Sequence, residues 1–261
     1  MRLLVTGGSG YLGSEVLRRA RAQGWDAVGW AFSQPGLPSV DVRDPAAVER
    51  ALERASPDAV VHTAYLQEGP GARSVTVEGA ENVARAARGA RLVHLSTDVV
   101  FDGRRPGGYS EDDEPAPITD YGRSKAEAER LVAAAHREAL VVRTSLIVGG
   151  PGAPPGKHER LRPGAVYHTD ELRCPVQLGD LARALLELVE LDVSGPLHVA
   201  GEDVVSRYEL ACLVAASRGL DPGEIRGGPA PPGRPLDCAL DSRRARRLVG
   251  TELRGARTVL A

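Results

Sequence analysis

Residues 1–13 read MRLLVTGGSGYLG, and this stretch decides the expected fold. Residues 2–5 form a short apolar run, which is typical of a buried parallel strand. Gly7, Gly10 and Gly13 follow in a turn, after which apolar residues recur at helical spacing. A strand, a glycine turn and a helix form a cradle for a pyrophosphate, because the N–H groups at the helix start attract its charge. We therefore expect a dinucleotide-binding site here, with a glycine turn that binds nothing as the alternative.

Apolar runs and helical patterns alternate along the rest of the chain. The expected strands are residues 27–30, 39–42, 58–62, 91–96, 140–144 and 197–199. The expected helices are residues 45–55, 74–87, 120–137, 179–191, 206–217 and 241–249. This alternation predicts an α/β fold with a doubly wound parallel sheet, Rossmann-like, and right-handed crossovers.

The expected domain organisation follows from a change in amino-acid composition after residue 149. Residues 149–164 and 227–235 are rich in glycine and proline, which is typical of loops. We expect a dinucleotide-binding domain over residues 1–149, to which residues 176–200 return. Residues 150–175 and 201–261 form a small C-terminal substrate lobe, which closes over the strand ends where open parallel sheets bind ligands.

Composition excludes several classes of function. Charged residues make up 26% of the 261 residues, the formal net charge is −2, and no basic block stands out, so we expect neither a nucleic-acid nor a membrane partner. No apolar run reaches the roughly 18 residues that a membrane span needs, and the start of the chain resembles no signal peptide. The three cysteines are widely spaced and no metal-ligand spacing occurs, so we expect a cytoplasmic protein with reduced thiols and no metal.

Candidate catalytic residues lie in two segments. Thr97 ends an expected strand, while Tyr121 and Lys125 are four residues apart on an expected helix and therefore share one face. An ammonium beside a phenol lowers the phenol pKa from about 10, so that the tyrosine can exchange a proton with a carbonyl or alcohol. Thr97 can hydrogen-bond the same substrate oxygen. The alternative is a packed tyrosine and a solvated lysine.

Five motifs carry a family resemblance: TGGSGYLG (6–13), STDVVFDG (96–103), YGRSK (121–125), RTSLIVG (143–149) and RPLDCALDSRRARRLVG (234–250). With them the chain resembles an extended short-chain dehydrogenase/reductase, and more narrowly the dTDP-4-dehydrorhamnose reductase group. The resemblance implies hydride transfer from a nicotinamide cofactor to the 4-keto group of a nucleotide-linked sugar. It also implies a triad of Thr97, Tyr121 and Lys125, with Lys125 holding the nicotinamide ribose. A homodimer is a possible assembly.

The cofactor residues expected from the pattern and the resemblance begin with the glycine cradle. They are Gly7, Ser9, Gly10, Tyr11, Leu12, Gly13, Phe32, Ser33, Asp41, Val42, Ala64, Tyr65, Ser96, Tyr121 and Lys125. An NAD site places a carboxylate after the second strand, whereas here Ser33 can donate to a 2′-phosphate and no arginine follows. We therefore expect NADP(H) as the preferred cofactor, with NAD(H) also possible.

The expected substrate residues are Thr97, Asp98, Val99, Leu146 and Arg234, the last because a guanidinium suits a pyrophosphate. The resemblance implies aromatic residues where Val99 and Leu146 stand. It also implies an asparagine where the chain has Thr76. Dehydratases of this superfamily carry a second carboxylate at the position of Val99, so simple carbonyl reduction fits better.

A second resemblance leads to a different function. The regulatory β subunit of methionine adenosyltransferase shares the VFDG block and the YGxxK helix. Residues 170–176 (DELRCPV) are at least as similar to such side branches of the superfamily as to the reductases. The alternative is therefore a non-catalytic, dinucleotide-binding regulatory subunit of another enzyme.

Overall fold

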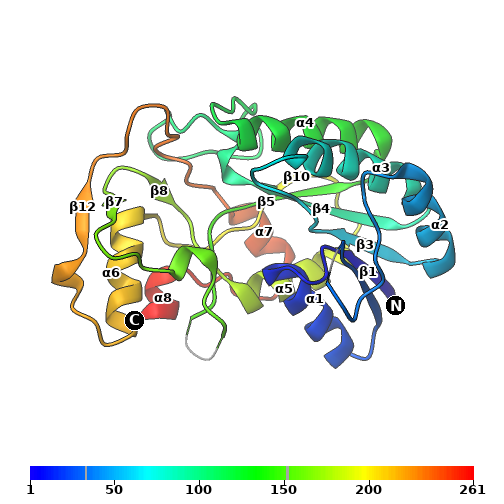
Figure 1. The fold of residues 1–261 in the computed structure, drawn as a ribbon, viewed down its shortest axis with the longest axis horizontal. Helices are drawn as coiled ribbons and strands as arrows, with labels where there is room; N and C mark the ends of the chain where they lie inside the picture. Colours follow the sequence, from blue (N-terminus) through cyan, green and yellow to red (C-terminus); the bar gives the residue numbers. More distant parts are fainter. Residues whose placement is uncertain (33, 151–152) are drawn as a thin grey trace. The chain divides into compact units, whose positions relative to one another are not determined.

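The central sheet of the computed structural model confirms the expected fold class. The structure describes residues 1–32, 34–150 and 153–261. Within these residues six strands form the sheet in the order β10-β5-β4-β3-β1-β2 (Figure 1). The strands are β1 (Arg2–Thr6), β2 (Asp26–Trp30), β3 (Ala59–His62), β4 (Arg91–Thr97), β5 (Leu140–Thr144) and β10 (Gly195–His198). β1 pairs in parallel with β2 and β3, and β3 pairs in parallel with β4.

Helices cover both faces of this sheet. They are α1 (Tyr11–Ala22), α2 (Pro45–Ala55), α3 (Gly79–Ala86), α4 (Asp120–Ala135) and α5 (Leu178–Val189). Leu4, Val60 and Leu92 share one face of neighbouring strands, and α2, α3 and α4 pack their buried residues against them. α1 lies on the opposite side in Figure 1 and contacts β1 and β2. This arrangement is the doubly wound fold that the alternation of strands and helices predicts.

The chain divides into two compact units. One comprises Met1–Ser96, Arg123–Val142 and Ala182–Pro196, and the other Thr97–Gly122, Arg143–Leu181 and Leu197–Ala261. Compactness does not show which residues bind a ligand, so the division into a dinucleotide-binding domain and a substrate lobe remains a prediction.

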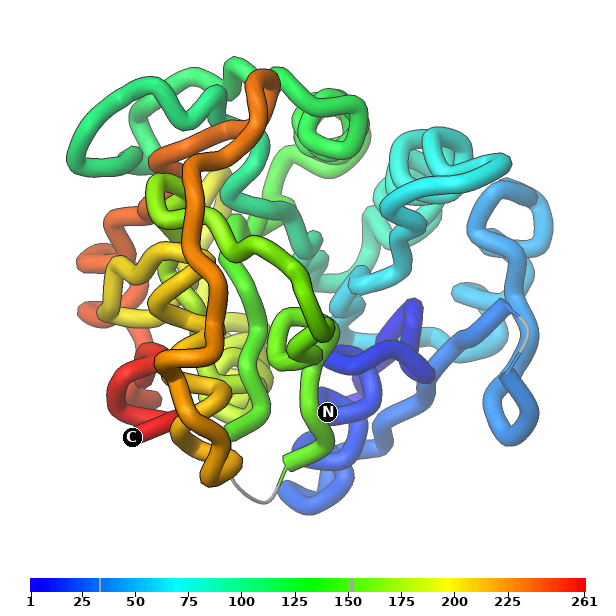
Figure 2. Tube along the Cα trace, turned by 60° about the vertical axis from the view of Figure 1, so that its left-hand side comes forward, coloured from blue at the N-terminus to red at the C-terminus, as the bar shows by residue number. Residues whose placement is uncertain are grey.

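Short elements build the second unit. They are η2 (Asp98–Val100), β6 (Ile147–Val148), η3 (Lys157–Glu159), β7 (Val166–His168), β8 (Leu172–Arg173), β9 (Val176–Gln177), β11 (Val205–Ser206), α6 (Arg207–Ser217), η4 (Pro222–Glu224), β12 (Arg226–Gly228), α7 (Arg243–Leu248) and α8 (Ala256–Leu260). β6 pairs with β9, β8 with β11, and β7 with β12, which is far from β7 in sequence (Figure 2). No helix in the described ranges is both long and apolar enough to cross a membrane.

The predicted strand over residues 39–42 is wrong. Ser39 forms only an isolated bridge with Ala31, and the chain then turns, since the N–H of Asp44 donates to the carbonyl of Asp41. The Asp41 side chain also accepts from the N–H of Arg43, which stabilises the turn. The helix predicted over residues 74–87 begins as a π-helical turn, Ser74–Glu78. The loop predicted over residues 149–164 contains η3, and its residues 151 and 152 lie outside the described ranges.

The core between the sheet and α2–α4 generates a stability prediction. Leu92 is 1% exposed within this core, so we expect Leu92→Ala to lower the free energy of unfolding by about 2–5 kcal/mol through lost burial and a residual cavity. Leu66→Ala removes the same atoms from a side chain that is 41% exposed, and should cost no more than about 0.5 kcal/mol. Urea denaturation of both variants measures the difference, and equal losses would contradict the assigned core.

Candidate functional site

The glycine turn after β1 packs closely against neighbouring segments of the chain because it lacks side chains. Gly7 has a φ of +67°, and a Cβ there would lie 2.8 Å from the backbone nitrogen of Ala64. A Cβ at Gly13 would lie 2.3 Å from the carbonyl oxygen of Gly7. Gly7 therefore requires glycine for its conformation and for close packing, and Gly13 requires it for close packing of α1 against the turn.

The turn leads directly into α1, whose N-cap is Gly10. Ser9 and Gly10 are exposed, Tyr11 is half-buried, and Leu12 and Gly13 are buried. Gly10 has no side chain with which to cap the first N–H groups, and the N-terminus of a helix favours an anion. A closely packed glycine turn that ends at such a helix start fits the pyrophosphate of a dinucleotide.

The end of β2 brings together two residues expected from the sequence and one that sequence reasoning missed. Phe32 is 62% exposed, and the guanidinium of Arg43 lies over its ring, 5.4 Å from the centroid. Asp41 accepts from Arg43 Nη2 at 2.7 Å, and this hydrogen bonding lowers the pKa of Asp41 below its usual value. Val42 is buried against Gly79. Ser33 lies outside the described residues.

The segment after β3 approaches Lys125 of α4. Ala64 donates from its backbone to Thr6 Oγ1 at 3.4 Å, and Tyr65 is 42% exposed. Lys125 is 4% exposed, its Nζ lies 5.5 Å from the centre of the Tyr65 ring, and it donates to the carbonyl oxygen of Leu95 at 2.6 Å. Burial lowers the pKa of Lys125 to about 8. The lysine is therefore a buried group in the first unit and not a solvated one.

At Thr76, where the resemblance implies an asparagine, the side-chain hydroxyl is hydrogen-bonded to the backbone. Its hydroxyl donates to the carbonyl oxygen of Leu66 at 2.9 Å and accepts from the N–H of the same residue at 3.2 Å. Thr76 lies in the π-helical turn before α3 and is 1% exposed. Its hydroxyl thereby fixes the segment that carries Tyr65.

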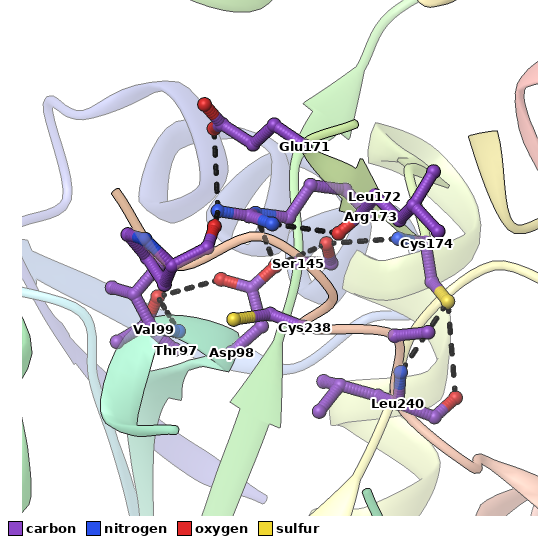
Figure 3. Close-up of polar contacts among 12 residues, drawn as sticks. Thr97, Asp98, Val99, Ser145, Glu171, Leu172, Arg173, Cys174, Cys238 and Leu240 are labelled. Carbon is purple, nitrogen blue, oxygen red and sulfur yellow. Dashed lines mark hydrogen bonds and ion pairs between the residues drawn. The ribbon is translucent and has the colours of Figure 1, made fainter. Parts of the chain in front are cut away.

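In the second unit, Thr97 and Asp98 begin a buried polar network (Figure 3). Thr97 Oγ1 donates to Asp98 Oδ1 at 3.2 Å and accepts from the N–H of Val99 at 3.4 Å. Ser145 Oγ donates to Asp98 Oδ2 at 2.5 Å, and Arg173 Nε lies 3.5 Å from the same oxygen. Asp98 is 3% exposed, and burial raises its pKa although Arg173, Ser145 and Thr97 oppose the rise. Asp98 thus acts on Thr97 as an orienting acceptor.

Glu171 extends this network to Arg234. Glu171 Oε1 accepts from Arg173 at 3.2 Å, and Glu171 Oε2 accepts from Arg234 Nη2 at 2.8 Å and lies 2.8 Å from His168 Nδ1. Burial favours a higher pKa for Glu171, but Arg173, His168 and Arg234 together lower it. The Arg234 side chain remains 47% exposed, so its guanidinium faces solvent while Glu171 holds it.

The start of α4 is packed tightly against the segment after Thr97. A Cβ at Gly122 would lie 2.2 Å from the carbonyl oxygen of Val99, so only glycine permits this approach. The N–H of Gly122 donates to Thr119 Oγ1 at 3.1 Å, which fixes the first turn. Tyr121 precedes this glycine and is half-buried. Within the second unit, the residues around Tyr121 therefore lie against the segment that follows Thr97.

The predicted site residues thus divide between the two units. The first unit holds the glycine cradle, Phe32, Asp41, Val42, Ala64, Tyr65, Ser96 and Lys125, and the second holds Thr97, Asp98, Val99, Tyr121, Leu146 and Arg234. Leu146 packs against the apolar cluster around Val148 and Val205. Sequence reasoning missed Arg43, Ser145, Glu171 and Arg173. A charged segment (residues 170–173) between loop and strand patterns was the available signal for the last two.

The whole chain matches the model of a known protein family. The description of the matching family model is RmlD substrate binding domain, and the match covers residues 1–261. The chain belongs to this family. It is 38% identical to dTDP-4-dehydrorhamnose reductase of Mycobacterium tuberculosis (strain H37Rv), over all of this chain and 91% of that protein. It is also 30% identical to methionine adenosyltransferase 2 subunit beta of Pongo abelii, over 91% of this chain and 80% of that protein.

Solved structures agree with this membership, which confirms the resemblance drawn from the motifs. A hypothetical dTDP-4-dehydrorhamnose reductase of Sulfolobus tokodaii is similar with a TM-score of 0.83 and 32% identity, over 97% of each chain. The dTDP-4-dehydrorhamnose reductase of Bacillus anthracis in complex with NADP has a TM-score of 0.85 at 24% identity, over 99% of this chain and 96% of that chain. The latter likeness shows the shared fold.

The buried pair of Asp98 and Arg173 generates a pH-dependent stability prediction. Arg173→Met leaves the Asp98 carboxylate without its cation, which should cost about 3–5 kcal/mol where that group is ionised. Burial raises the pKa of Asp98 in the folded protein above its unfolded value. The folded state therefore keeps the Asp98 proton to a higher pH than the unfolded state does, and the free energy of unfolding falls as pH rises through this range. Removing the cation extends this loss to higher pH. The stability difference from the parent should therefore widen between about pH 5 and about pH 8.

Urea denaturation at both pH values measures this difference. Arg104→Met is the matched control, since the Arg104 side chain is 80% exposed, and its effect should stay within about 0.5 kcal/mol at either pH. An Arg173→Met difference that is the same at both pH values would show that Arg173 does not stabilise the ionised Asp98.

Proposed function

We propose that this chain is an NADP(H)-dependent reductase of a nucleotide-linked 4-keto sugar. The observation that carries the proposal is family membership over all 261 residues, together with an intact glycine cradle and a buried Lys125. The name of the 38% identical relative, dTDP-4-dehydrorhamnose reductase, supplies the substrate class. A cytoplasmic location and a homodimer remain predictions.

The dinucleotide fits the first unit. The glycine cradle and the start of α1 would hold its pyrophosphate, Asp41 and Val42 would lie toward its adenine, and Ala64 and Tyr65 would line its path. When bound, the cofactor supplies the hydride that reduces the carbonyl carbon. Lys125 would hydrogen-bond the ribose beside the nicotinamide.

The protein's own residues supply the proton that the substrate oxygen accepts during the reduction. Tyr121 donates its phenolic proton to the substrate oxygen as that oxygen becomes an alcohol. The Lys125 ammonium stabilises the phenolate that remains, because an adjacent cation lowers a phenol pKa. Thr97 positions the substrate oxygen, and Asp98 in turn orients the Thr97 hydroxyl. Asp98 is hydrogen-bonded to Ser145 and paired with Arg173, which supports reduction without loss of water.

The residues expected to bind the substrate lie in the second unit. The half-exposed guanidinium of Arg234 suits a diphosphate, and Glu171 fixes its direction. Val99 and Leu146 would offer apolar surface to the sugar where related enzymes have aromatic rings. Oxidation of NADPH with a panel of keto-sugar nucleotides, and with NADH in parallel, tests the substrate class and the cofactor together.

A second function is favoured by one observation, the 30% identity to methionine adenosyltransferase 2 subunit beta. In this alternative the chain binds a dinucleotide and regulates another enzyme without turnover. Absence of NADPH oxidation with every sugar nucleotide, combined with capture of a methionine adenosyltransferase from cell extract, would favour it.

The proton role of the phenol gives a prediction for Tyr121→Phe. General acid catalysis contributes roughly 10²–10⁴-fold, so kcat should fall by about that factor while the Kd for NADPH changes little. Tyr208→Phe is the matched control, because Tyr208 lies on α6 outside the candidate site, and its kcat should equal that of the parent. Steady-state kinetics and NADPH fluorescence titration measure both quantities. Unchanged kcat in Tyr121→Phe would remove the tyrosine from its role.

The position of Arg43 gives a prediction on cofactor choice. Its guanidinium lies over Phe32, at the end of β2 where the adenosine ribose of a bound dinucleotide is expected. Arg43→Ala should weaken NADPH binding roughly tenfold or more through loss of charge-assisted hydrogen bonds to the 2′-phosphate, and leave NADH binding almost unchanged. Arg54→Ala, an exposed arginine on α2, is the control for net charge. Fluorescence titration that shows equal weakening for both cofactors would contradict this assignment.

A further inference from the structure

α4 carries three functional groups on successive turns: Tyr121, Lys125 and Glu129 (Figure 1). Residues four apart on a helix are neighbours, so the lysine lies between the phenol and the carboxyl group along one face. Glu129 is 8% exposed, although a glutamate is seldom buried unless it is paired. The proposed reaction has no step for this carboxyl group, and its burial requires an explanation.

Ser96 and Glu129 contact each other directly. The Ser96 hydroxyl donates to Glu129 Oε1, and Ser96 is 4% exposed. Ser96 stands near the end of β4, one residue before Thr97. The carboxylate thereby ties α4 to the end of β4. Lys125 ties the same helix to the same strand, since its Nζ donates to the carbonyl oxygen of Leu95.

The groups that surround Lys125 come from three elements. His62 of β3 and His94 of β4 are stacked with ring centroids 5.2 Å apart, and Tyr65 follows β3. Burial, together with the Lys125 charge, lowers the pKa of His62 to about 3 and that of His94 well below its usual value, so both rings are neutral. Tyr121 and Glu129 lie on α4 itself. Among the described groups that shift the Lys125 pKa, Glu129 is the one that raises it.

We propose that Glu129 is a positioning residue, whose buried carboxylate accepts from Ser96 one helical turn from Lys125 and keeps Lys125 in the ammonium form beside the carbonyl oxygen of Leu95. The proposal rests on the proposed function in one respect, that Lys125 acts on Tyr121. Glu129 touches neither the substrate nor the reacting atoms. It acts through Lys125, because only a charged lysine favours the phenolate of its neighbour.

The composition of the chain allows a direct test on Lys125. The sequence has 33 lysines and arginines, and only two of them, Lys125 and Lys157, are lysines. Carbon-13 labelling of lysine at the ε carbon therefore gives two side-chain NMR signals, and Lys157→Arg assigns them. Titration of the protein without cofactor or substrate then reports the Lys125 pKa independently of any enzymatic activity.

Two substitutions separate the charge of Glu129 from its hydrogen bond. Glu129→Gln keeps an acceptor for Ser96 but removes the charge, and should lower the Lys125 pKa from its value of about 8 by roughly one unit or more. Ser96→Ala removes the hydrogen bond and keeps the charge, so the Lys125 pKa should move by less than about half of that shift. Glu129→Asp, which retains a carboxylate, should return the titration toward that of the parent.

The pH dependence of turnover provides the second readout. Activity falls as pH rises through the Lys125 pKa, because the neutral amine no longer favours the phenolate. The alkaline limb of kcat/KM should therefore move to lower pH in Glu129→Gln by the shift measured by NMR, and should stay near the parent position in Ser96→Ala. A merely structural role would reduce kcat without moving this limb.

The outcomes distinguish this proposal from the proposed function. Equal Lys125 titrations in the parent, Glu129→Gln and Glu129→Asp would overturn the role of Glu129, whether or not the protein reduces any sugar. If Glu129→Gln does not fold, Glu129→Asp decides: its shorter side chain changes the distance between the negative charge and Lys125, so a shifted Lys125 titration supports the proposal, and a titration equal to that of the parent overturns it. A clear NMR shift without turnover by any variant would leave the coupling established and refute the reductase.

Discussion

A charged side chain can be buried only where neighbouring groups replace the water that it loses, and this constraint governs both units. In the first unit it applies to Lys125, whose ammonium is held by a backbone carbonyl, the face of Tyr65 and the charge of Glu129. Desolvation reduces the cost of deprotonating the lysine, and the carboxylate limits that effect. The pKa of Lys125 therefore depends on a balance between burial and one nearby negative charge.

The second unit meets the same constraint with the signs reversed. Asp98 is a buried anion, and Arg173 is the cation that accompanies it. Arg173 is itself fixed by the backbone carbonyls of Leu172, Pro235 and Leu236, so the pair joins three segments that are distant in sequence. Thr97 is oriented at one end of this network, and Arg234 is held at the other through Glu171. A mutation in the middle of the network should therefore affect both ends.

The sequence predicted the sheet, the glycine cradle and the Tyr121–Lys125 helix because each depends on a local pattern. These patterns are the short apolar runs, the glycines three residues apart and the residues four apart on one helix face. It failed at residues 39–42, where an apolar–polar alternation resembles a strand but Asp41 and Arg43 bind each other and close a turn. It also missed Arg173 and Glu129. Their importance comes from partners on other elements, Asp98 and Ser96, and no local pattern records such pairing.

The scarcity of lysine has a practical consequence for any search for a binding partner. Lys125 is 4% exposed, which leaves Lys157, on η3, as the exposed side-chain amine of the chain. Apart from the α-amino group of Met1, amine-reactive cross-linkers would therefore sample only the region around Lys157 and would overlook many partners bound elsewhere. Reagents that couple carboxylates or arginines, both abundant here, are the better choice for deciding whether this protein works alone or in a complex.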